Sequence, residues 1–96
     1  MKKKIYIPHI NYTVFIKDFK PLPELPNAKA YVKSNGQHSC DLFLNGRPHP
    51  GDLSHELIHV LQFICLERNI DFTLEQEHMA YLMHYLMGQV MGWDFK

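Results

Sequence analysis

The stretch DLSHELIHVLQFICLER occupies residues 52–68. It contains no proline, and its apolar residues recur with helical spacing on almost every side: Leu53, Leu57, Ile58, Val60, Leu61, Phe63, Ile64 and Leu66. A helix with so wide an apolar surface is expected to be buried on most sides. The stretch therefore predicts a core helix against which the rest of the chain packs.

The residues before this helix predict strands and turns. All six prolines precede residue 51. Residues Ile5–Ile7 and Tyr12–Phe19 are rich in aromatic and β-branched side chains, which favour strands. Residues Ala28–Lys33 and His38–Leu44 flank an Asn-Gly pair that is typical of a type I′ hairpin turn. We therefore expect three or four short strands in the first half of the chain.

A second helix is expected after residue 71. Asn69-Ile70-Asp71 interrupts the first helix, and Thr73 with Gln76 three residues later matches a capping box. The second helix should run to about Gly88 or Val90. The sequence thus predicts one α+β domain over residues 1–96, in which a small antiparallel sheet of three or four strands packs on two antiparallel helices.

Composition excludes several classes of protein. The 96 residues are 46% hydrophobic and 21% charged, with a formal net charge of zero, which argues against disorder and against a basic nucleic-acid binder. No apolar run approaches the ~20 residues that span a membrane. Two cysteines, Cys40 and Cys65, fit a reducing cytoplasm better than a secreted disulfide scaffold. The sequence does not indicate the oligomeric state.

Residues His55-Glu56-Leu-Ile-His59 match the H-E-x-x-H motif. At ~100° per residue, the two imidazoles lie one turn apart and Glu56 falls in the same narrow arc. This pair can bind one Zn²⁺ at ~2.0–2.1 Å, and Glu56 can take a proton from water that the metal activates. Gln62, one turn beyond His59, could hydrogen-bond nearby. The alternative is a pair of surface histidines on a polar stripe, with Glu56 interacting with the helix dipole.

A catalytic zinc needs a third protein ligand. The second helix offers four candidates: Glu75, Glu77, His78 and His84. Helical spacing places Glu77 at the head of a polar stripe with Tyr81 and His84, which favours it mildly over Glu75. Tyr81 or His84 could also donate a hydrogen bond to the oxyanion that forms during hydrolysis.

The residues 55–59, followed by Glu75-Gln-Glu77-His-Met-Ala-Tyr81, resemble the H-E-x-x-H … E-x-E-A-x-A-[FY] pattern of small zinc metallopeptidases of the gluzincin type. The chain is similar to ImmA/IrrE-like peptidases and to short metallopeptidases encoded by phages and prophages. His78 departs from the small residue usual at its position, and the partner domains of larger relatives are missing.

The resemblance implies a minimal zincin fold with zinc held between the two helices. It also implies that His55, His59 and Glu77 bind the metal and that Glu56 is the general base. In such peptidases the strand before the motif helix lies at the cleft edge and pairs with the peptide. We therefore expect this role for Cys40, Asp41, Leu42, Phe43 and Leu44.

Two functions follow from these expectations. The first is a zinc-dependent metallopeptidase that acts on a protein or peptide, in the host cytoplasm if a phage encodes it. The second is a catalytically silent binding module that keeps the zincin fold and contacts a host or virion protein. The stoichiometry and coordination of bound metal would separate the two.

Overall fold

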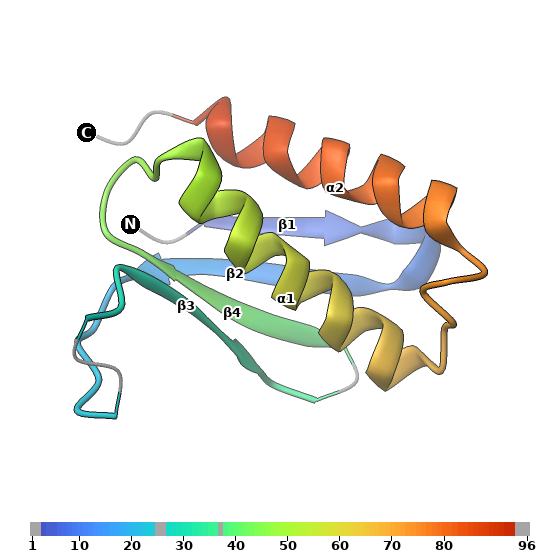
Figure 1. The fold of residues 1–96 in the computed structure, drawn as a ribbon, viewed down its shortest axis with the longest axis horizontal. Helices are drawn as coiled ribbons and strands as arrows, with labels where there is room; N and C mark the ends of the chain where they lie inside the picture. Colours follow the sequence, from blue (N-terminus) through green and yellow to red (C-terminus); the bar gives the residue numbers. More distant parts are fainter. Residues whose placement is uncertain (1–2, 25–26, 37, 94–96) are drawn as a thin grey trace.

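The computed structural model describes residues 3–24, 27–36 and 38–93. Four strands form one sheet in the order β1-β2-β4-β3: β1 (Lys3–Ile7), β2 (Tyr12–Asp18), β3 (Ala30–Ser34) and β4 (Ser39–Leu44). Two helices cover one face of this sheet, α1 (Pro50–Arg68) and α2 (Gln76–Met91), as Figure 1 shows. The predicted α+β class is confirmed. The prediction of a purely antiparallel sheet is wrong, because β2 and β4 run parallel.

The strands alternate between a buried face and an opposite face. Ile5, Val14 and Cys40 lie side by side across β1, β2 and β4, and each is at most 2% exposed. Side chains of successive strand residues point to opposite faces of a sheet. The β-branched residues at alternate positions therefore face the helices and form the core with their buried leucines.

The predicted hairpin joins β3 to β4. Val32 pairs with Leu42 in antiparallel register, and the Asn35 amide donates to the Ser39 carbonyl at 3.0 Å. Gly36 has a φ of 104°, which favours glycine, but Asn35 is not among the residues with positive φ. A type I′ turn needs positive φ at both central residues, so that turn type is not adopted.

Helix α1 buries only one side. It begins after His49, whose Nδ1 accepts the Gly51 amide at 3.0 Å, and ends at Asn69, which adopts a left-handed conformation. The fully or nearly fully buried residues share one face: Leu53, Leu57, Val60, Leu61, Ile64 and Cys65. Ile58 and Leu66 are 41% and 80% exposed, so the expectation of burial on most sides is wrong.

Helix α2 returns alongside α1 and buries Met79, Leu82, Leu86 and Val90 (Figure 1). The predicted capping box is not formed, because Glu75 precedes the first helical residue and makes no side-chain cap. Instead, the Asp71 carboxylate accepts the amide of Thr73 at 2.9 Å in the preceding turn. Within the described residues, neither helix is long and apolar enough to cross a membrane.

The one-sided burial of α1 can be tested with a matched pair of leucines. Leu57→Ala removes a side chain that is 0% exposed and should lower the free energy of unfolding by about 2–5 kcal/mol, because it leaves a cavity. Leu66→Ala, on the same helix but 80% exposed, should change it by less than about 0.5 kcal/mol. Urea unfolding measures both. Equal losses would contradict the orientation of the helix.

Candidate metal centre

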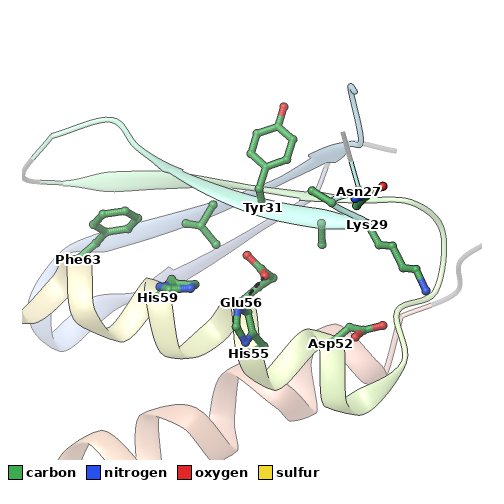
Figure 2. Close-up of a pocket in the computed structure, with 11 residues that line it drawn as sticks. Asn27, Lys29, Tyr31, Asp52, His55, Glu56, His59 and Phe63 are labelled. Carbon is green, nitrogen blue, oxygen red and sulfur yellow. Dashed lines mark ion pairs between the residues drawn. The ribbon is translucent and has the colours of Figure 1, made fainter. Parts of the chain in front are cut away.

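The H-E-x-x-H residues line a pocket of about 580 Å³ between α1 and β3 (Figure 2). Strand β3 passes over the helix, and the Glu56 carboxylate points from α1 toward it. The lining comes from both elements and from the segment before β3: Asn27, Ala28, Lys29, Ala30, Tyr31, Val32, Asp52, His55, Glu56, His59 and Phe63. The motif therefore faces an open cavity under the sheet edge.

The two motif histidines lie close enough to share an ion. Their ring centroids are 5.1 Å apart, and the planes are nearly perpendicular. Two nitrogens that bind one Zn²⁺ at ~2.0–2.1 Å lie at most about 4.2 Å apart, a separation that small side-chain rotations can produce here. The His55 side chain is 71% exposed, so its ring is free to turn.

Gln62 fixes the second histidine, as its spacing suggested. Its Oε1 lies 3.0 Å from His59 Nδ1. An amide oxygen accepts a hydrogen bond, so Nδ1 is the donor in this pair, and in the neutral ring Nε2 then keeps its lone pair. This is the arrangement in which a second partner orients a histidine that binds a metal.

Glu56 is less exposed than either motif histidine. Its side chain is 13% exposed, and its Oε2 lies 3.8 Å from His55 Nε2. Burial raises the pKa of this carboxyl; the nearby His55 and His59 act in the opposite direction without cancelling the effect, and Asp52 adds to it. A carboxylate of raised pKa is a stronger base, which suits proton transfer from water.

The predicted third ligand lies elsewhere. Glu77 is exposed on α2 and borders a separate pocket of about 300 Å³ with Ala80, Tyr81 and His84. Met79 faces the core, and two residues of helix rotate the chain by ~200°, so Glu77 points away from the core. Because α2 packs on the side of α1 away from β3, Glu77 does not meet the motif histidines in this structure, and zinc held between the helices stays a prediction (Figures 1 and 2).

The other residues proposed on α2 share this outward position. Tyr81 is 72% exposed, and neither it nor His84 lines the pocket of the histidine pair. Glu75 is exposed before the helix, and His78 lies against His9. Across residues 3–24, 27–36 and 38–93, no three His, Cys, Asp or Glu side chains form a group that could hold a metal.

The strand expected to pair with a peptide is an interior strand. β4 has β2 on one side and β3 on the other, and its residues Cys40–Leu44 are at most 8% exposed. Their backbone groups are therefore engaged within the sheet. The edge strands are β1 and β3, and the only strand neighbour of β3 among the described residues is β4.

Several pocket residues escaped the sequence analysis. Asp52 precedes His55 by three residues, so its position on the same stripe could have been read from the helical spacing. The same holds for Phe63, four residues after His59, whereas Lys29 and Tyr31 carry no such signal, because their proximity depends on the order of strands in the sheet.

No family model matches the chain, and neither a curated protein nor a solved structure is significantly similar to it.

The raised pKa of Glu56 predicts a pH-dependent effect of Glu56→Gln in metal-free buffer. The folded chain holds this proton more tightly than the unfolded chain, so ionisation of Glu56 destabilises the fold as pH rises above ~4.3, the ordinary pKa of glutamate. The variant should therefore have a higher Tm than the parent at pH 7, and the difference should disappear near pH 4.

Glu77→Gln serves as the control, because this carboxylate is exposed. It should show no comparable gain in Tm at pH 7. A Glu56→Gln chain that is no more stable than the parent at pH 7 would show that burial does not dominate at this position.

Proposed function

We propose that the chain is a zinc-dependent metallopeptidase in which His55 and His59 hold the metal and Glu56 is the general base. The proposal rests on one observation: these three side chains line a single pocket beneath β3, which is an edge strand of the sheet. The hydrogen bond from His59 to Gln62, which leaves His59 Nε2 available, supports it further. Glu77 is not part of the proposed site. His55 and His59 would supply two of the three protein ligands usual for catalytic zinc, and water would occupy the other positions.

Each group in the pocket has a separate task. Bound zinc would supply Lewis acidity and lower the pKa of a water toward ~7. Glu56 takes a proton from the attacking water and passes it to the nitrogen of the leaving amine. Its low exposure keeps this carboxylate away from bulk solvent, and its raised pKa strengthens it as a base.

We propose the free edge of β3 as the place where the peptide binds. A sheet edge offers unpaired backbone groups, and an extended peptide can add to it as a further strand. Ala30, Tyr31 and Val32 of β3 line the same pocket as the histidines, so such a peptide would pass over Glu56 (Figure 2). Main-chain pairing would give affinity with little preference for sequence.

The second candidate is a binding module of a phage or mobile element that contacts a host or virion protein. It is favoured by the position of Glu77, which leaves two protein nitrogens where catalytic zinc usually has three protein ligands. Leu66 and Leu74, each 80% exposed, offer apolar contact surface for a partner. Zinc-dependent cleavage of peptides would decide for the enzyme.

We place either form in a reducing compartment such as the cytoplasm. Cys40 and Cys65 are both buried free thiols, and burial raises the pKa of Cys40 to about 12. Such thiols are poor nucleophiles and act as small core residues.

Glu56→Gln should abolish hydrolysis while leaving the metal in place. Glutamine keeps the size of glutamate but cannot accept the proton, so cleavage of a fluorescence-quenched peptide library should fall at least ~10²-fold. Zinc content, measured on the same samples, should stay equal to that of the parent. Cleavage at the parental rate would contradict the role of Glu56.

Zinc affinity should depend on His59 of α1 and not on Glu77 of α2. His59→Gln removes one of two proposed ligands and should weaken zinc binding at least ~10²-fold in calorimetric titration, whereas Glu77→Gln should change it less than about twofold. Asp52→Asn tests whether the Asp52 carboxylate, which lines the same pocket, contributes to zinc affinity. A large loss in Glu77→Gln would contradict the site and favour coordination between the helices.

A further inference from the structure

A second pair of histidines meets outside the motif pocket. His9 lies in the short 3₁₀ helix η1 (Pro8–Ile10), and His78 lies in the first turn of α2. Their Nε2 atoms are 3.3 Å apart, although 69 residues separate them in the chain. The rings are nearly parallel, with centroids 5.3 Å apart and an angle of 18° between the planes. The fold thus brings together two side chains that sequence spacing does not connect.

We propose that His9 and His78 form a binding site for a borderline divalent cation of the Zn²⁺ type. Two nitrogens that bind one tetrahedral ion at ~2.0–2.1 Å lie about 3.3–3.4 Å apart. The Nε2–Nε2 distance of 3.3 Å already meets this requirement. Imidazole nitrogen is also the ligand that zinc, copper and nickel share.

The same contact shows that the nitrogens face each other. A hydrogen bond between two Nε2 atoms needs a proton on one ring and a lone pair on the other. An ion can replace that shared proton if the donor ring changes to the tautomer that carries its proton on Nδ1. The donor then gives up its Nε2 proton to solvent and takes one at Nδ1, so both rings stay neutral and both offer a lone pair.

Both histidines are held by ordered elements. On one side, Pro8 fixes the start of η1, and Asn11 closes it in a left-handed conformation with its side-chain oxygen accepting from the Tyr6 hydroxyl at 3.0 Å. On the other side, His78 precedes Met79, which is 2% exposed in the core. The backbone at each histidine is therefore anchored, which keeps the two rings within reach of each other.

The surroundings of the pair suit an ion with open positions. Both histidines are exposed, so water can complete the coordination. They border a pocket of about 420 Å³ whose other lining residues are largely apolar: Ile7, Pro8, Tyr81, Leu82 and Tyr85.

An ion at this site would connect the start of the sheet to the last helix. A domain of this size has a thin core and gains from such a cross-link. At a free Zn²⁺ concentration one hundred times Kd, binding shifts the folding equilibrium ~100-fold, which corresponds to ~10–20 °C in Tm for a domain of this length.

The experiment uses the full chain carrying His55→Gln and His59→Gln, which removes the motif histidines and leaves the second pair intact. Thermal unfolding is followed with and without ZnCl₂, and the nitrogen coupling of bound Cu²⁺ is measured by electron paramagnetic resonance. We expect a Zn²⁺-dependent rise in Tm and coupling to two imidazole nitrogens. Both should be lost on adding His9→Gln or His78→Gln, and kept on adding His84→Gln.

Zinc stoichiometry in the otherwise unchanged chain provides an independent measurement. His9→Gln should lower the number of bound zinc ions by one. The proposal is overturned if the His55→Gln/His59→Gln chain shows no Zn²⁺-dependent rise in Tm, or if His9→Gln leaves that rise unchanged. Neither outcome depends on whether the motif pocket binds metal or cleaves peptides.

Discussion

The packing of one face of α1 against the sheet fixes the position of every polar side chain on that helix. Leu53, Leu57 and Ile64 are fully buried, and helical geometry then fixes the direction in which the side chains between them point. His55 lies two positions from Leu53 and from Leu57 and therefore faces away from the core. Glu56 falls on the border between the two faces, where β3 covers it. The partly buried acid and the exposed imidazoles thus have a common origin in apolar packing.

Local features of the fold could be predicted from the sequence because local interactions decide them. The hairpin of β3 and β4 follows from its turn residues, and α1 follows from its apolar spacing. The direction of β2 relative to β4 could not be read in this way, because it depends on how two distant segments meet. Ile58 and Leu66 misled the prediction of burial, since an apolar side chain on a helix need not face the core.

In the candidate site, too, some features depend on local sequence and others on how distant segments pack. His55, Glu56 and His59 lie within one turn, so their proximity is a property of the helix itself. Any ligand from α2 depends on the rotation of that helix, which Met79 and Leu86 set by entering the core. The choice of strand at the cleft depends on sheet order, which places β3 rather than β4 at the edge. The resemblance to gluzincins thus stays a prediction for the motif helix, and Glu77 stands outside the arrangement it implied.

The sheet consists of two hairpins joined along a single parallel seam, where Thr13 lies opposite Ser39 and Asp18 opposite Leu44. Each hairpin closes through a short turn, whereas the seam requires the long connection from β2 to β3 to bring the hairpins together. Closing such a connection costs chain entropy before any apolar contact across the seam is gained. We therefore expect the docking of the two hairpins to limit the rate of folding. Helices α1 and α2 would then pack only after the four-stranded sheet has formed.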